Sequence, residues 1–308
     1  MKVALAQIAP VLLDRSATIA RIVGALERAH EQGASLVCFG ETLLPGYPLW
    51  VSRTDGARFD DALQKELHAL YLAQAVCVEA GDLAPIQEAA RAHGQWVVLG
   101  AAERPRDRGQ TLYASAITLG PDGAVRSCHR KLVPTYEERL CWGIGDGHGL
   151  VTHDLGSFTL GSLNCWENWL PLARASLHAQ GETLHVMLWP GSAGLTQDIT
   201  RFVAREGRSY VLSASSIARE QDLPADLPAR ERMAEAGELL YDGGSCIAGP
   251  DGAWVIEPVV GREEILVAEL DPAAVRRERQ NMDPSGHYSR PDVLRLHLDR
   301  DRQSVLAD

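Results

Sequence analysis

The chain has 308 residues, of which 45% are hydrophobic, and this supplies enough apolar material for one large core. Its formal net charge of −11 leaves no basic face for a long polyanion, so nucleic acid is not an expected partner. We find no secretory signal, and no apolar run of the roughly 18 residues that cross a bilayer. We therefore expect a cytoplasmic protein without a membrane partner, whose six cysteines are reduced.

The first half of the chain alternates short buried strands with helices. Hydrophobic periodicity predicts strands at 3–7, 36–39 and 95–100, and helices at 15–32, 60–71 and 84–93. Two further segments, 111–118 and 124–130, flank a Gly-Pro-Asp-Gly turn and are expected to form a hairpin. A long loop follows at 133–149.

The second half continues the same mixture. A strand ends at Cys165 and is expected to turn at once into a helix, because Pro171 suits a first helical turn. Further strands are predicted at 184–188, 210–215, 245–248, 254–256 and 265–270, and helices at 198–207 and 272–279. The polar segment 218–240 is the best candidate for a mobile or oligomer-contacting insert. This alternation predicts an α/β protein in which two mixed sheets pack together under helices.

Three chemically active residues stand at strand ends: Glu41, Lys131 and Cys165. Ligands of layered α/β proteins bind at the carboxyl ends of strands. A carboxylate there can take the thiol proton, and an ammonium can stabilise negative charge on a substrate. Backbone N–H groups at the start of the following helix are expected to favour the thiolate. The alternative is a surface ion pair and a buried, inert cysteine.

Three motifs surround these residues in sequence. They are Gly-Glu-Thr at 40–42 with Pro-Gly-Tyr-Pro at 45–48, His-Arg-Lys-Leu at 129–132 with Pro-Thr at 134–135, and Asn-Cys-Trp-Glu-Asn at 164–168. In this order they resemble the nitrilase superfamily of carbon–nitrogen hydrolases, and Cys-Trp-Glu-Asn resembles its nitrilase branch. The resemblance implies a four-layer α-β-β-α sandwich. It implies a catalytic domain at 1–280 and a tail at 281–308 that packs on a neighbouring subunit.

The resemblance also implies an activity, the hydrolysis of a small organic nitrile to a carboxylic acid and ammonia through a thioimidate and an acyl-enzyme. The implied catalytic residues are Cys165 as nucleophile, Glu41 as base, Lys131, and Glu138 as a second glutamate, with Glu137 as its adjacent alternative. The implied substrate-binding residues are Tyr47, Trp142, Trp166 and Pro190. No metal or organic cofactor is needed, because thiol, carboxylate and ammonium supply every proton and charge. The implied partner is a second copy, in a homodimer built through helices or in a larger, spiral homo-oligomer.

Several alternatives remain beside this interpretation. An amide hydrolase or an amide-forming enzyme would use the same three residues, and a non-catalytic scaffold would share the fold. A zinc site among Cys128, His129, Cys141, His148 and His153 is disfavoured, because neighbours in a strand point to opposite faces and the spacing fits no common pattern. A Cys/His protease is disfavoured because none of the ten histidines lies in a recognisable partner motif.

Overall fold

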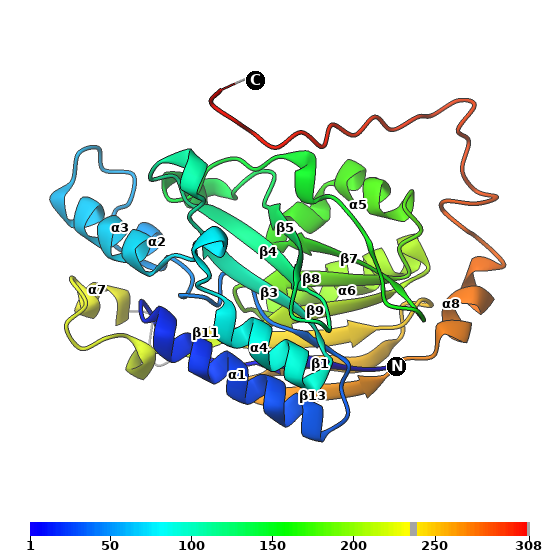
Figure 1. The fold of residues 1–308 in the computed structure, drawn as a ribbon, viewed down its shortest axis with the longest axis horizontal. Coiled ribbons are helices and arrows are strands. Elements are labelled where there is room, and N and C mark those ends of the chain that lie inside the picture. The colour runs from blue at the N-terminus through cyan, green and yellow to red at the C-terminus, as the bar shows by residue number, and fades with distance from the viewer. Residues whose placement is uncertain (235–238, 307–308) are drawn as a thin grey trace.

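The computed structural model describes residues 1–234 and 239–306, and its strands form two sheets (Figure 1). The first sheet has six strands in the order β13-β1-β2-β3-β4-β5. Their bounds are β1 (Lys2–Gln7), β2 (Leu36–Cys38), β3 (Trp96–Glu103), β4 (Tyr113–Leu119), β5 (Val125–Arg130) and β13 (Glu264–Glu269). Strands β1, β2 and β3 are parallel, whereas β13, β4 and β5 pair antiparallel, so the sheet is mixed as predicted.

The second sheet has seven strands, in the order β10-β11-β9-β8-β7-β6 with β12 paired to β11. Their bounds are β6 (His153–Asp154), β7 (Thr159–Asn164), β8 (Leu184–Trp189), β9 (Tyr210–Ser215), β10 (Ile217–Arg219), β11 (Leu239–Ala248) and β12 (Trp254–Val260). Strands β7, β8 and β9 are parallel and the other pairs are antiparallel. The carboxyl ends of the parallel strands therefore lie along one edge of the sheet.

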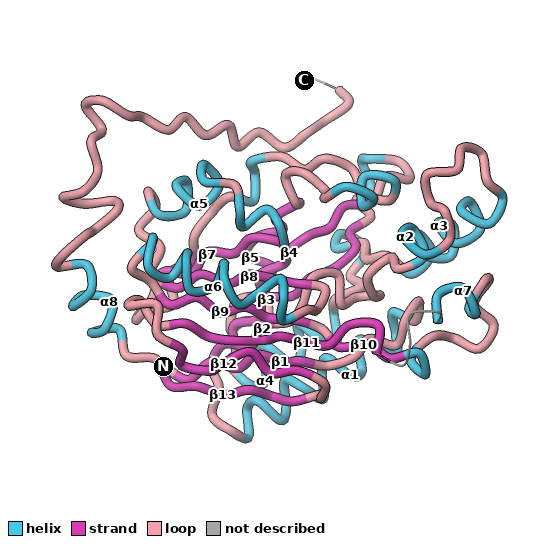
Figure 2. The backbone as a smooth tube through the Cα atoms, turned by 180° about the vertical axis from the view of Figure 1, so that it is seen from behind, coloured by secondary structure: helices cyan, strands magenta, loops and turns pink. Residues whose placement is uncertain are grey.

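Helices cover the outer face of each sheet. Helices α1 (Arg15–Glu31) and α4 (Ala84–His93) lie on the first sheet, and α5 (Pro171–His178) and α6 (Ala193–Gly207) lie on the second, where Figure 2 shows α6 in front of β8 and β9. Leu5 and Val98 from the first sheet meet Val186 and Leu212 from the second in a separate core cluster between the sheets. The predicted four-layer α-β-β-α sandwich is confirmed.

The remaining helices are short or lie at one end of the molecule. Helices α2 (Trp50–Arg53), α3 (Ala62–Gln74) and α7 (Arg230–Ala234) gather there (Figure 1). The 3₁₀ helices are η1 (Val78–Ala80), η2 (Arg106–Arg108), η3 (Tyr136–Leu140), η4 (Gly147–Gly149), η5 (Cys165–Trp169) and η6 (Glu220–Asp222). The segment 218–240 buries Leu223, Leu227 and Met233, which does not fit a mobile insert; its residues 235–238 lie outside the described residues.

The predicted tail, from residue 281 on, follows α8 (Pro272–Arg279) and runs extended over the molecule (Figure 1). Near its end it docks on its own chain. The Arg302 guanidinium donates to Asp146 Oδ1 at 3.1 Å and to the Cys128 carbonyl at 2.9 Å, and Gln303 N donates to Asp146 Oδ2 at 3.0 Å. Packing of the tail on a neighbouring subunit stays a prediction. In the part of the chain that the structure describes, each helix is too short or too polar to cross a membrane.

Candidate active site

The three residues predicted from strand ends meet at one place. Glu41 lies three residues beyond β2, and Lys131 and Cys165 directly follow β5 and β7. Carboxylate oxygens of Glu41 and Glu138 and the Cys165 sulfur all lie within 4.8 Å of one another. The Lys131 Nζ donates to Glu41 Oε1 at 2.9 Å and to Glu138 Oε2 at 2.6 Å. All four side chains are buried. The structure therefore brings the four sequence-predicted catalytic candidates together.

Two glycines permit the backbone around Glu41 to sit between the sheets. A Cβ on Gly40 would clash with Ser216 and with the Trp189 carbonyl, and a Cβ on Gly100 would clash with the backbone of residues 40–42. The Glu41 N–H donates to the Trp189 carbonyl at 3.0 Å, which joins the first sheet to the end of β8 in the second. This close approach fixes the Glu41 carboxylate relative to Cys165.

Glu138, rather than Glu137, is the glutamate that faces Lys131. It occupies the third position of η3, where Thr135 N donates to its Oε2 at 2.6 Å in a capping box. The Tyr47 hydroxyl donates to its other oxygen, Oε1, at 2.8 Å. The Thr-x-x-Glu spacing at 135–138 is a capping-box pattern, and this signal in the sequence distinguishes the two neighbouring glutamates.

Cys165 sits at a strained corner between β7 and η5. Its φ of +47° lies in the left-handed region, which non-glycine residues adopt at a cost and which often marks functional sites. Burial raises the pKa of its thiol well above the usual value, and the Glu41 carboxylate adds to the rise. Lys131 and the Trp166 backbone N–H act in the opposite direction but do not overcome burial. The backbone N–H thus favours the thiolate, as predicted, but burial outweighs it and the thiol needs a base.

Glu41 has the proton affinity of such a base. Burial raises its pKa to about 7, against the lowering effect of the Lys131 ammonium and the raising effect of the Glu138 carboxylate. Burial would lower the pKa of Lys131, but the Cys165 sulfur, once ionised, and the Glu41 and Glu138 carboxylates raise it above the usual value. Near neutral pH the site thus holds a protonated thiol, a permanent ammonium and a carboxylate that can gain or lose its proton.

A buried glutamate, Glu167, hydrogen-bonds to the chain at the ends of both β5 and β7. Its carboxylate accepts from His129 Nε2 at 2.9 Å and from Leu132 N at 2.7 Å, on either side of Lys131. It also accepts from Asn164 N at 3.0 Å, directly before Cys165. Burial opposes ionisation, but His129 and these N–H donors hold the pKa of Glu167 below its usual range. The sequence reasoning missed this clamp, although Asn-x-x-Glu at 164–167 is again a capping-box spacing.

Of the residues predicted to bind substrate, two border the catalytic cluster with their side chains, and the Trp166 side chain points to the surface instead. The Tyr47 ring meets the Trp142 ring edge-on at 5.5 Å, and Trp142 lies 5.8 Å from Lys131 Nζ, so both border the cluster. Pro190 is buried directly after β8. The Trp166 side chain is 50% exposed and lies beside the Trp169 ring, while only its backbone N–H faces the thiol.

One further aromatic residue borders the cluster and was not predicted. The Tyr241 ring meets Tyr47 edge-on at 5.9 Å, and its buried hydroxyl has no hydrogen-bond partner among the described residues. Burial raises its pKa well above the usual value. Binding roles for Tyr47, Trp142, Trp166 and Pro190 stay predictions, to which the position of Tyr241 adds a candidate.

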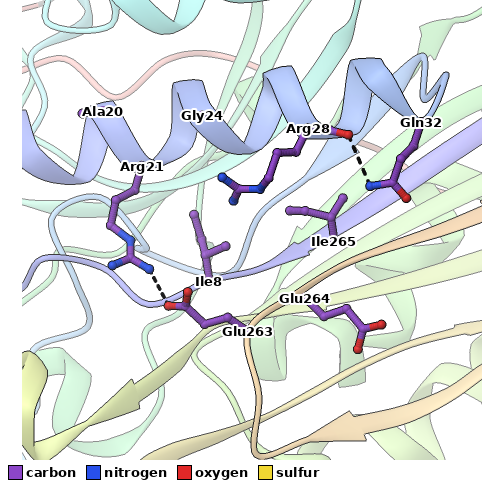
Figure 3. Close-up of a pocket in the computed structure, with 9 residues that line it drawn as sticks. All are labelled: Ile8, Ala20, Arg21, Gly24, Arg28, Gln32, Glu263, Glu264 and Ile265. Carbon is purple, nitrogen blue, oxygen red and sulfur yellow. Dashed lines mark hydrogen bonds and ion pairs between the residues drawn. The ribbon is translucent and has the colours of Figure 1, made fainter.

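The structure argues against a zinc site and a Cys/His protease, the two other site chemistries. Among the described residues, the ligand atoms of Cys128, His129, Cys141, His148 and His153 form no group close enough to share a metal ion. At Glu41 and Glu138, the Lys131 ammonium already lies between the two carboxylates. The groups beside the Cys165 sulfur are carboxylates, which contradicts a Cys/His protease. A hollow elsewhere, between α1 and β13, holds none of these residues. Arg21 and Glu263 pair across it, as Figure 3 shows.

An α-β-β-α sandwich that brings a buried cysteine, two carboxylates and an ammonium together fits the class of hydrolases that work through a thiol nucleophile. Comparison with known proteins gives the family. The chain belongs to the carbon–nitrogen hydrolase family, whose sequence model matches residues 2–280.

Two relatives match over nearly their whole length. The chain is similar to an aliphatic nitrilase of Sinorhizobium fredii, with 34% identity over 99% of this chain and 98% of the relative. It is also similar to a nitrilase of Pseudomonas syringae pv. syringae, with 35% identity over 100% of this chain and 92% of the relative. Among solved structures, a carbon–nitrogen hydrolase of Helicobacter pylori has a TM-score of 0.71 and 20% identity, covering 95% of this chain and 96% of that one. At this level of identity, the likeness to the solved structure shows the fold alone.

Proposed function

We propose that the protein is a nitrilase, which hydrolyses a small organic nitrile to a carboxylic acid and ammonia. The observation that carries the proposal is the convergence of Cys165 with the Glu41 and Glu138 carboxylates around one buried ammonium. Full-length similarity to proteins named aliphatic nitrilase and nitrilase supports the choice of a nitrile. The bordering Tyr47 and Trp142 rings suit a substrate that is small and largely apolar.

The first step forms a covalent bond. Glu41 takes the proton of the Cys165 thiol, and the sulfur attacks the nitrile carbon. The electron pair of one C–N bond moves to nitrogen, which takes a proton, and the product is a thioimidate. The Lys131 ammonium and the Trp166 backbone N–H are the donors that stabilise the developing negative charge. The proton that leaves sulfur is thereby returned to the substrate nitrogen.

Two water molecules complete the reaction. The first adds to the thioimidate carbon and gives a tetrahedral intermediate with hydroxyl, amino and thiol substituents. Protonation of the amino group expels ammonia and leaves a thioester on Cys165. The second water displaces the thiol, which recovers its proton, and the carboxylic acid leaves. Glu138 contacts Lys131 and lies within 4.8 Å of the sulfur, so we assign it the orientation of Lys131 and of water.

A panel of aliphatic, aryl and arylacetonitrile substrates tests this proposal. Ammonia, acid and amide are measured together, with Cys165→Ala as the control that retains the pocket but lacks the nucleophile. Equal release of acid and ammonia by the wild type alone supports the nitrilase. Turnover of amides but of no nitrile identifies an amide hydrolase instead. Amide as the main product means that the tetrahedral intermediate expels the thiol before ammonia, and complete inactivity on both classes favours a non-catalytic scaffold.

We further propose a homodimer through the helices of the second sheet. Large apolar side chains are exposed on η5, α5 and α6 and at the residue between η5 and α5: Trp166, Trp169, Leu170, Leu172 and Phe202. Exposed apolar side chains in this number suit an interaction surface. Leu172→Glu is expected to halve the mass measured by analytical ultracentrifugation, whereas Phe59→Glu, at an exposed aromatic residue outside the proposed interfaces and the tail, is the control.

Assembly beyond the dimer has a second candidate surface. Tyr136, Leu140 and Ile144 are exposed on and after η3, the helix that carries Glu138. A spiral homo-oligomer would bury this surface, and the tail would then pack on a neighbour. A cytoplasmic, reducing environment suits the protein, because all six cysteines are unpaired and the proposed nucleophile must be a free thiol.

A further inference from the structure

Behind the candidate nucleophile, a buried amide holds the strained corner of the chain. Asn168 Nδ2 donates to the Cys165 carbonyl at 2.8 Å and to the Leu163 carbonyl at 3.3 Å. The two carbonyls lie on either side of the residue whose φ is +47°. A single side chain thus spans the turn from β7 into η5 and fixes the peptide that carries the thiol.

The orientation of that amide is set by a histidine on the neighbouring strand. His185 on β8 places its Nε2 at 2.8 Å from Asn168 Oδ1. The Asn168 amide cannot turn over, because its oxygen would then face two carbonyl oxygens. His185 Nε2 therefore carries a hydrogen and donates it to the amide oxygen.

The histidine ring is held in turn by Glu182, which precedes β8. Glu182 Oε1 lies 2.7 Å from His185 Nδ1, and Asn168, His185 and Glu182 are all 0% exposed. One proton lies between Nδ1 and Oε1, so the pair is neutral overall whichever atom holds it. Gly161 on β7 leaves room for this carboxylate, because a Cβ there would clash with Glu182 Oε1. His178 is the other titratable neighbour, 3.7 Å from Glu182 Oε2.

We propose that Glu182, His185 and Asn168 form a positioning chain that holds the backbone of Cys165 in its left-handed conformation and so aims the thiol at the substrate. The inference deepens the proposed function and rests on the role of Cys165 in it. Asn168 acts through the Cys165 carbonyl, and His185 and Glu182 act through Asn168. In the described part of the chain, none of the three side chains hydrogen-bonds to Glu41, Lys131 or Glu138, so their effect is on geometry and not on proton transfer.

Two substitutions that hardly change side-chain volume test the positioning chain: Asn168→Asp breaks it and Glu182→Gln keeps it. Asn168→Asp replaces the donor by an acceptor, so the Cys165 carbonyl loses its partner and meets a carboxylate. Glu182→Gln keeps the chain, because a neutral His185 accepts from the new amide at Nδ1 and still donates from Nε2. The double substitution Glu182→Leu with His185→Leu removes the buried polar pair as a unit, which is tolerated better than removal of one partner.

Gln95 supplies a matched control in the first sheet. It is also 0% exposed, and its Nε2 donates to the Leu26 and Ala34 carbonyls at 3.3 and 3.0 Å. Gln95→Glu therefore makes the same chemical change as Asn168→Asp, at a position with no link to Cys165. If the change only lowers stability, both variants show a lower thermal unfolding temperature. If Asn168 has a positioning role, only Asn168→Asp also lowers the reactivity of the Cys165 thiol.

The experiment measures the alkylation rate of Cys165 by iodoacetamide, followed by mass spectrometry, together with kcat and KM on a nitrile. Asn168→Asp and the double leucine variant are expected to lower both the alkylation rate and kcat at least about tenfold, with KM within about twofold. Glu182→Gln and Gln95→Glu are expected to stay within about threefold of wild type. A wild-type alkylation rate in either folded chain-breaking variant overturns the proposal, as does an equal loss in Gln95→Glu.

Thiol alkylation needs no nitrile turnover, so the two proposals fail separately. If wild type hydrolyses no nitrile while Asn168→Asp still slows alkylation, the positioning chain stands and the proposed reaction does not. If wild type hydrolyses nitriles but the chain-breaking variants leave alkylation unchanged, the proposed reaction stands and the positioning chain does not. Should one chain-breaking variant fail to fold, the other still gives the decisive alkylation rate. Failure of both, with Gln95→Glu folded, assigns the chain to stability and overturns its positioning role.

Discussion

The raised pKa of Glu41 predicts a steep loss of activity in mild acid. A general base acts in its unprotonated form, so kcat/KM follows the ionised fraction of Glu41 and rises with pH through about 7. Lowering the pH from 8 to 5.5 reduces that fraction about thirtyfold for a pKa of about 7. An ordinary glutamate, with a pKa of about 4.3, would lose less than about a tenth of its ionised form over the same range.

The assay is ammonia release from a small nitrile across this pH range, at substrate concentrations well below KM. No loss is expected from the other two groups on the acid side, because the pKa values of Lys131 and Cys165 are raised and both stay protonated there. Return of the acid-treated enzyme to pH 8 controls for unfolding. The fall of kcat/KM on the acid side reports the titration of the coupled cluster around Glu41 as a whole. A profile that stays flat down to pH 5 would refute the assignment of Glu41 as a base of raised pKa.

Three further substitutions test the catalytic cluster and the docked tail. Cys165→Ala should lower turnover by several orders of magnitude and keep the far-ultraviolet circular dichroism of wild type, and substantial ammonia release would contradict the nucleophile. Glu41→Gln should form normal oligomers yet show no acyl-thioester on Cys165 by mass spectrometry after incubation with nitrile; a fully acylated protein would remove Glu41 from the role of base. Arg302→Ala should lower the free energy of unfolding by about 1–3 kcal/mol, because Asp146 is buried and loses a charged donor. The exposed Arg295→Ala is its control, and equal unfolding temperatures would show that the docked tail adds no stability.

The elements that carry the chemistry were predictable from local patterns. Glu41 and Cys165 follow largely buried strands with a hydrophobic signature, whereas Lys131 follows a hairpin arm that the Gly-Pro-Asp-Gly turn predicted. Ligand groups at the carboxyl ends of strands are expected to meet in this type of fold. Glu138 was favoured over Glu137 by resemblance alone, although the capping-box spacing from Thr135 gives a physical reason.

The contacts that the sequence did not reveal join residues far apart in the chain. His185 reaches Asn168 from a neighbouring strand, and Arg302 reaches Asp146 from 156 residues away. No periodicity encodes such pairs, because each depends on how strands and tail lie in space. The raised pKa of Cys165 could not be predicted either, because the effect of the Trp166 N–H is local whereas the larger, opposing effect of burial is a property of the whole fold.

The left-handed backbone at Cys165 means that the protein carries, at this position, a residue that the backbone conformation disfavours. A side chain with a Cβ costs about 1–2 kcal/mol in this conformation, whereas glycine adopts it freely. Cys165→Gly should therefore resist thermal unfolding better than Cys165→Ala, although both lack the sulfur. Reactivity and robustness are in conflict at this single peptide, and a search for more heat-resistant variants would be drawn toward inactive ones.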